Sequence, residues 1–145
     1  VSGFEAPVYI AWSGRNRSPL IRIPAKRGMS TRIELRSPDP TCNPYLTLAV
    51  CLKAGLEGIK NKIQPPEQCN RNIYEMSPAE RVQLGIESLP ENLKEAVCEL
   101  EKDQLLRETL GEHVFDRFIE AKKIEWDRYR IQVHPWETVE YLSKF

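Results

Sequence analysis

Three short segments near the start of the chain have the composition and spacing of β-strands. Residues 8–12 (VYIAW), 20–24 (LIRIP) and 31–36 (TRIELR) contain many branched and aromatic side chains, and the connections between them contain Gly, Ser, Asn and Pro. Residues 37–40 (SPDP) end this region, because proline cannot donate to a sheet ladder. The pattern predicts a small antiparallel sheet of about three strands at the N-terminal end of the chain.

A helix is predicted at about 44–63, shortly after these strands. Asn43 is placed to cap its first turn, and Pro44 suits that turn because an N–H there would have no helical partner. Apolar residues recur three and four positions apart, which is typical of one helical face. They are Tyr45, Leu48, Ala49, Leu52, Leu56, Ile59 and Ile63.

The remainder of the chain is also predicted to be helical, after a loop at 64–76. Ser77 and Ser88 are each followed three residues later by a glutamate, which is the spacing of a capping box, so a helix is expected to begin at each. Gly111 is expected to end a later helix. A small sheet followed by helices belongs to the α+β class. The further helices are expected at about 103–110, 112–132 and 136–143.

Composition indicates one soluble globular domain, since 41% of the 145 residues are hydrophobic and 29% are charged. No apolar run approaches the roughly 20 residues that cross a bilayer, so no membrane partner is expected. The four cysteines lack disulfide or zinc spacing, which favours reduced thiols in a cytoplasmic protein. Residues 1–40 carry a balance of +4 and residues 41–145 one of −4. The basic stretch is therefore a solvated face or an anion site, and the acidic remainder gives little reason to expect nucleic acid.

The third predicted strand concentrates charged side chains on one face. Side chains alternate along a strand, so Arg32, Glu34 and Arg36 share a face. Arg22 lies on the preceding strand, and residues 15–18 (RNRS) connect the first two. One interpretation is a solvated face with ion pairs of small value. The other is an anion site, in which arginines bind phosphate or carboxylate and the glutamate holds a divalent cation. Spacing alone leaves both open.

Several ordered motifs resemble the C-terminal catalytic region of type I glutamine synthetases, and the resemblance covers essentially the whole chain. The final third looks most like the enzymes of low-GC Gram-positive bacteria. The motifs are residues 3–8 (GFEAPV), 16–18 (NRS), 22–24 (RIP), 32–40 (RIELRSPDP), 43–46 (NPYL), 55–62 (GLEGIKNK), 118–122 (FIEAK) and 132–137 (QVHPWE).

This resemblance implies a nucleotide and metal side of an active site. Glu34 matches a glutamate that binds a metal ion, magnesium or manganese. Arg17 and Arg22 match arginines that contact the ATP phosphates and the transferring phosphoryl group, and Arg32 matches another arginine on the nucleotide side. In that family, ATP phosphorylates the γ-carboxylate of L-glutamate, and ammonia then displaces phosphate to give glutamine.

The resemblance also implies an amino-acid side of the site. Arg36 matches the arginine that binds the glutamate substrate, and Arg17 is expected to contribute there too. Glu5 matches the glutamate of a mobile flap that closes over the substrate and helps to deprotonate ammonium. Glu5 and Arg17 are therefore the expected catalytic residues.

Further expectations follow from the same resemblance. Residues 1–145 are expected to be the C-terminal portion of a catalytic domain, without its first part and without the N-terminal domain, and to be inactive alone. The full-length protein is expected to form a homo-oligomer, a dodecamer. The loop at 26–31 differs in length from the enterobacterial pattern, so adenine contacts are not assigned there. Tyr74 aligns with a tyrosine that is adenylylated in enterobacterial enzymes, but it is expected to be structural or merely exposed.

Two alternatives stay open at this point. One is a relative of the same fold that joins glutamate to an organic amine. The other is a non-catalytic regulatory or assembly module that presents its helices to partner subunits.

Overall fold

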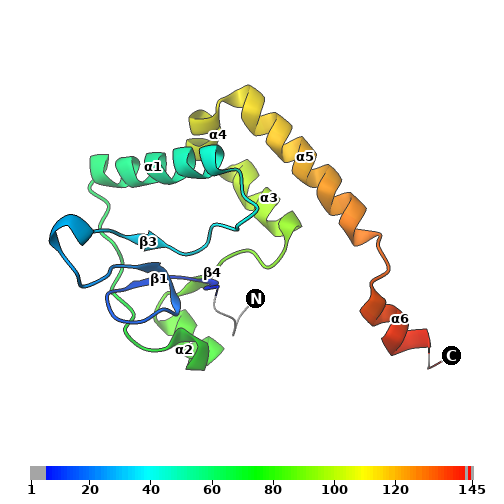
Figure 1. The fold of residues 1–145 in the computed structure, drawn as a ribbon, viewed down its shortest axis with the longest axis horizontal. Coiled ribbons are helices and arrows are strands. Elements are labelled where there is room, and N and C mark those ends of the chain that lie inside the picture. Colours follow the sequence, from blue (N-terminus) through cyan, green and yellow to red (C-terminus); the bar gives the residue numbers. More distant parts are fainter. Residues whose placement is uncertain (1–5, 143, 145) are drawn as a thin grey trace. The chain divides into compact units, whose positions relative to one another are not determined.

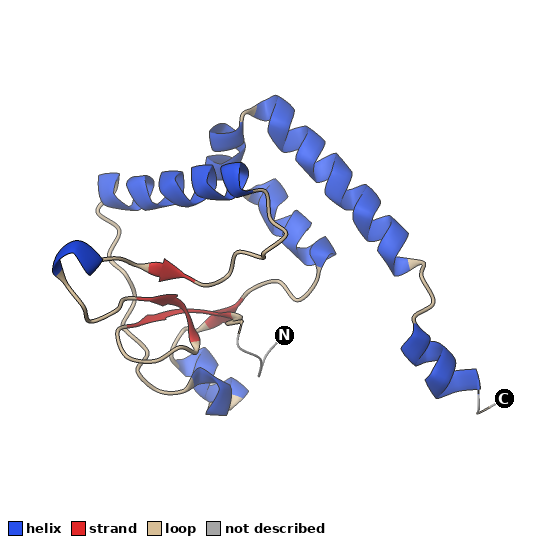
Figure 2. Cartoon of the chain, in the orientation of Figure 1, coloured by secondary structure: helices blue, strands red, loops and turns tan. Residues whose placement is uncertain are grey.

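The computed structural model describes residues 6–142 and 144 (Figure 1). The chain divides into two compact units, Val1–Glu91 and Asn92–Phe145, each with its own buried core. In the described residues the strands belong to the first unit, and the last four helices belong to the second (Figure 2). The α+β class is confirmed. No helix in this part of the chain is long and apolar enough to cross a membrane.

The strands of the first unit form one mixed sheet. β1 and β2 run parallel, whereas β3 pairs antiparallel with β2 and β4 antiparallel with β1, in the order β3-β2-β1-β4. The prediction of an antiparallel sheet of about three strands is therefore wrong for the pairing of β1 with β2, which is parallel, and it misses β4. Alternation is the same in both strand directions, and β4 is a polar segment of two residues, so neither feature has a signal in the sequence. The strands are β1 (Tyr9–Ser13), β2 (Pro19–Arg22), β3 (Glu34–Leu35) and β4 (Glu87–Ser88).

The buried core of the first unit joins the sheet to a segment predicted as a loop. Tyr9 from β1 packs with Ile73 and Met76, and Ile73 is fully buried. Ile73 begins a short 3₁₀ helix, η2 (Ile73–Glu75), which the sequence pattern did not predict. This core brings residues near position 70 next to β1.

The capping box at Ser77 is confirmed. It begins helix α2 (Pro78–Gln83), and both halves of the box are formed. The Ser77 hydroxyl accepts the N–H of Glu80 at 3.2 Å, and Glu80 Oε2 accepts the N–H of Ser77 at 2.8 Å.

Helix α1 (Pro44–Lys60) begins where it was predicted to begin. The Asn43 side chain accepts the N–H of Tyr45 at 3.0 Å and that of Leu46 at 3.3 Å. The helix ends three residues earlier than predicted, and Lys62 then adopts a left-handed conformation with φ 53°. The large apolar side chains of the predicted face are between 54% and 84% exposed. They are Tyr45, Leu48, Leu52, Leu56, Ile59 and, just beyond the helix, Ile63.

The second unit is helical, with a core of Val97, Phe115 and Ile119. The predicted start at Ser88 is wrong. Ser88 pairs with Tyr9 in the sheet, and Asn92 caps the first helix instead by accepting the N–H of Glu95 at 3.0 Å. Gly111 ends the next helix as predicted, with φ 74°. The helices are α3 (Leu93–Lys102), α4 (Gln104–Leu110), α5 (Glu112–Arg130) and α6 (Pro135–Leu142).

Candidate functional site

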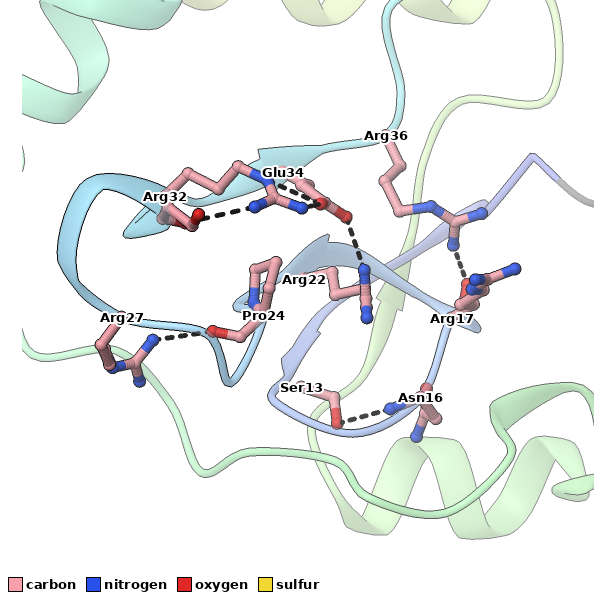
Figure 3. A network of polar contacts seen from close by, with 10 residues as sticks. Ser13, Asn16, Arg17, Arg22, Pro24, Arg27, Arg32, Glu34 and Arg36 are labelled. Carbon is pink, nitrogen blue, oxygen red and sulfur yellow. Dashed lines mark hydrogen bonds and ion pairs between the residues drawn. The ribbon is translucent and has the colours of Figure 1, made fainter.

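Glu34 lies between two arginine side chains at the β3 edge of the sheet. The register of β2 and β3 sets Glu34 directly opposite Arg22. Arg22 Nη1 donates to Glu34 Oε2 at 3.0 Å (Figure 3). Arg32 donates to Glu34 Oε1 through both Nε, at 2.9 Å, and Nη2, at 2.6 Å. Both carboxylate oxygens therefore accept hydrogen bonds from guanidinium groups.

These two arginines lower the pKa of the Glu34 carboxyl below its usual value of 4.5. The hydrogen bond from Arg22 is the largest cause, that from Arg32 comes next, and desolvation acts in the opposite direction. The Glu34 and Arg22 side chains are 29% and 27% exposed, so solvent screens the pair and its contribution to stability is small. Two cations around one anion leave an excess of positive charge, which favours binding of a further anion.

Arg22 has a second feature that points to a ligand. Its Nε–H is buried and finds no hydrogen-bond partner within the described part of the chain. A buried donor without an acceptor costs free energy. An anionic ligand would supply the missing acceptor.

A second group of polar side chains lines a cavity of about 440 Å³. Arg17 lies on the connection between β1 and β2, and Arg36 follows β3 directly. A guanidinium N–H of Arg36 donates to the backbone carbonyl of Arg17 (Figure 3). The backbone N–H of Arg36 donates to the Leu20 carbonyl at 3.0 Å, which holds this segment against β2. The other lining residues are Asn16, Ser18, Asn72 and Tyr74.

Residues 1–141 match the protein family described as glutamine synthetase, catalytic domain. The chain belongs to this family. The resemblance predicted from its motifs is therefore confirmed.

Curated glutamine synthetases match the chain over its whole length. The glutamine synthetase of Methanosarcina mazei is 60% identical over 143 residues, which is 99% of this chain and 32% of the relative. That of Staphylococcus aureus is 53% identical over 145 residues, which is 100% of this chain and again 32% of the relative. The chain spans about a third of the length of these curated relatives.

Two solved structures share the fold. One, described as apo GmaS without ligand, superposes with a TM-score of 0.77 at 36% identity and covers 94% of this chain and 30% of its own. The other is the glutamine synthetase of Plasmodium falciparum, with a TM-score of 0.75 at 25% identity, covering 96% of this chain and 35% of its own.

The residues that the glutamine synthetase motifs single out fall into two groups in the structure. Arg22, Arg32 and Glu34 form one group, and Arg17 and Arg36 form the other. Both groups lie along the β2–β3 side of one sheet (Figure 3). The motif assignment of Glu5 lies outside the described residues.

The described residues do not form a metal site by themselves. They contain no group of three or more His, Cys, Asp or Glu side chains that could hold a metal ion. Glu34 offers a single carboxylate, and magnesium typically takes one or two from the protein. In the structure both of its oxygens accept hydrogen bonds from arginines.

Four residues of the cavity were not predicted as site residues. Asn16 and Ser18 flank Arg17 in the NRS motif, and Asn72 and Tyr74 come from the segment predicted as a loop. Tyr74 is half-buried, and burial is the largest cause that raises the pKa of its phenol. The sequence offered a signal only for Asn16 and Ser18, which stand beside Arg17 in the NRS motif. That signal is weak, because Asn and Ser are ordinary turn residues.

The loop at 26–31 contains a 3₁₀ helix, η1 (Gly28–Ser30). Arg27 Nη1 donates to the Pro24 carbonyl at 2.7 Å (Figure 3), and the Met29 side chain is fully exposed. These contacts add no residue to either of the two groups described above.

Proposed function

We propose that the protein containing this chain is a glutamate–ammonia ligase that converts ATP, L-glutamate and ammonium into glutamine, ADP and phosphate. The observation that supports this most directly is the cationic surround of Glu34, next to a cavity that holds two more arginines. Membership of the glutamine synthetase family adds to that support.

The proposed roles follow from the charges that the reaction brings together. Attack of a carboxylate on the γ-phosphate of ATP joins two anions, so cationic groups must neutralise both. Arg22 and Arg32 are proposed to bind the ATP phosphates, and Arg17 the transferring phosphoryl group. Arg36 is proposed to bind the glutamate substrate, and Arg17 to contribute beside it. The positive excess around Glu34 and the unpartnered Nε–H of Arg22 support this division.

A divalent metal ion, magnesium or manganese, is part of the proposal. Glu34 is proposed as one of its ligands, because a carboxylate among phosphate-binding arginines suits a cation that binds phosphate oxygens. Such an ion would add positive charge beside the phosphate oxygens of the bound ATP. Its remaining ligands would come from other residues of the full-length protein.

Glu5 is proposed as the base for ammonium on the basis of its motif alone. Ammonium must lose a proton before it is a nucleophile, and a carboxylate is a suitable acceptor. A flap that closes over the site would also keep water from an acyl phosphate.

Assembly as a cytoplasmic homo-oligomer, with twelve subunits as the expected number, is also proposed. The exposed apolar face of α1 supports burial of this surface in the full-length assembly. Mass measurement of the full-length protein by light scattering tests the subunit number.

The test of the activity is phosphate release from ATP by the full-length protein that carries residues 1–145. Release is expected only when glutamate and ammonium are both present. Release with an organic amine but not with ammonium would replace the proposal by a glutamate–amine ligase. Release that does not depend on glutamate would contradict both.

A variant pair tests the role of Glu34. We expect Glu34→Ala to lower kcat by about 100-fold or more, since it removes a charged group from the centre of the phosphate-binding cluster. Glu87→Ala is the matched control, because Glu87 is an exposed glutamate on the opposite edge of the same sheet. Retained activity in Glu34→Ala would refute the metal role.

A further inference from the structure

The end of β1 and the connection that follows it are bonded to a segment more than 50 positions away in the sequence. The Trp12 indole N–H donates to the Pro66 carbonyl at 2.7 Å. The Cys69 N–H donates to the Trp12 carbonyl at 2.9 Å, and the Ser13 hydroxyl donates to Asn70 Oδ1, also at 2.9 Å. These bonds hold residues 66–73 beside the end of β1.

Asn16 uses both ends of its side-chain amide at this junction. Its Nδ2 donates to the carbonyl oxygens of Cys69 and Arg71, at 3.1 Å each. Its Oδ1 accepts from the N–H and from the hydroxyl of Ser18, at 3.0 Å each. A carboxylate could not make the first two bonds, because it has no N–H to donate.

Ser18 is held by Ile73 as well as by Asn16. Its side chain is buried, and its hydroxyl oxygen accepts the N–H of Ile73 at 3.1 Å. Ile73 is itself fully buried in the core of the first unit. The position of Ser18 is therefore set by the core, and that of Asn16 by two backbone carbonyls.

Arg17 stands between these two residues. Its side chain is exposed and lines the cavity. Because hydrogen bonds hold Asn16 and Ser18, they fix the position of the Arg17 backbone between them. The Arg17 carbonyl accepts a hydrogen bond from Arg36, the second arginine of that cavity.

We propose that Asn16 is a positioning residue, which together with Ser18 fixes the Arg17 backbone so that the guanidinium group meets the anion in the cavity. This inference rests on the proposed role of Arg17 in phosphoryl transfer. Displacement of a catalytic group by about 1 Å can lower a rate on the order of 100-fold. Asn16 would act through Arg17 and would not touch the substrate itself.

A double-mutant cycle in the full-length protein tests this. It measures kcat for the wild type, Asn16→Ala, Arg17→Ala and the double variant, with folding checked by circular dichroism. We expect Asn16→Ala to lower kcat on the order of 100-fold, and the double variant to be no slower than Arg17→Ala. A residue that acts only through Arg17 has nothing left to position once that side chain is removed.

Asn70→Ala is the matched control. It removes the Ser13–Asn70 bond between the same two segments, but it leaves the groups that bond the side chains of Asn16 and Ser18 in place. Asn70→Ala is expected to change kcat by no more than about twofold, whether it is introduced into the wild type or into Arg17→Ala. An equal loss in Asn70→Ala and Asn16→Ala would show a general loosening of the junction and would overturn the proposal.

The remaining outcomes are equally decisive. If the double variant is slower than Arg17→Ala by the full factor of Asn16→Ala, Asn16 acts elsewhere and the inference is wrong. Should Asn16→Ala not fold, Asn16→Asp takes its place in the cycle, because it keeps the acceptor for Ser18; failure of both to fold would assign Asn16 to stability instead. A wild type without glutamine formation overturns the proposed function before any variant is measured.

Discussion

Among the described residues, the Glu80 carboxyl has a pKa that folding lowers strongly. Its pKa is lowered from 4.5 to about 2, first by the hydrogen bond from Arg71 at 2.8 Å and then by the N–H and hydroxyl of Ser77. Folded protein therefore binds this proton less tightly than the unfolded chain. The stabilisation is present in full above about pH 4.5 and is lost as the pH falls toward about 2.

We predict that Glu80→Gln makes the free energy of unfolding less dependent on pH in this window. Glutamine keeps the shape of the side chain and an oxygen for the Ser77 cap, but it removes the group that titrates. Urea unfolding at a series of pH values measures the effect. Glu34 and Asp39 also have lowered pKa values, so the wild type retains some dependence and the comparison is between the two slopes. Identical slopes would contradict the prediction.

Part of the charged cluster could be predicted from residue types and alternation alone. Arg32 and Arg22 both pair with Glu34, as their residue types and positions suggest. Arg36 departs from the alternation because β3 ends at Leu35, so its side chain reaches the Arg17 backbone instead. The bonds of Asn16 could not be predicted, since two of its partners are carbonyl oxygens and every residue carries one.

At the scale of elements, the sequence rules for helix capping and termination correctly located those helix ends that are set by a single residue. Asn43, Ser77 and Gly111 each act where their chemistry predicted. The start at Ser88 failed because Asn92 offers an equal cap and tertiary pairing claims Ser88 for the sheet. Spacing alone could not choose between two caps four residues apart.

Two glycine substitutions should have opposite effects on stability. Gly111 has φ 74° and ψ 148°, which only glycine adopts easily, whereas Gly55 lies within helix α1; an added Cβ would meet nothing within 4 Å at either. We predict that Gly111→Ala lowers the free energy of unfolding by about 1–3 kcal/mol through backbone strain alone. Gly55→Ala should raise it by about 0.5–1 kcal/mol. Chemical denaturation of both variants checks the signs, and a stabilised Gly111→Ala would show that the backbone there is not restrained.

At the scale of the whole molecule, the largest unexplained feature is apolar surface. The face of α1 carries several large side chains that are more than half exposed, among them Leu52 and Leu56. Soluble monomers rarely keep apolar patches of this kind open to solvent. A chain that spans about a third of its relatives has this surface available to other parts of a full-length protein.

We predict that the 145-residue chain alone binds a hydrophobic dye and self-associates through this face. Leu52→Gln combined with Leu56→Gln should reduce both dye fluorescence and sedimentation mass, because it replaces apolar area by polar side chains. Lys53→Gln is the control on the same helix. A monomeric wild-type chain without dye binding would refute the prediction.

The same chain alone should form no glutamine. In its described residues, Glu34 brings one carboxylate to the proposed metal site, and no group of three or more metal-binding side chains surrounds it. An assay with ATP, glutamate, ammonium and magnesium decides this. Glutamine produced by the purified 145-residue chain would disprove it.

The junction between residues 13–18 and 66–73 has an unequal tolerance to mutation. On one side Asn16 must be an asparagine to make its bonds, whereas on the other side Cys69 and Arg71 contribute only their carbonyl groups. Replacing either side chain leaves those acceptors in place. As far as these two bonds decide it, a saturation scan should therefore find substitutions at position 16 tolerated less well than those at position 69, and this spatial contact would leave little correlated variation between the two positions.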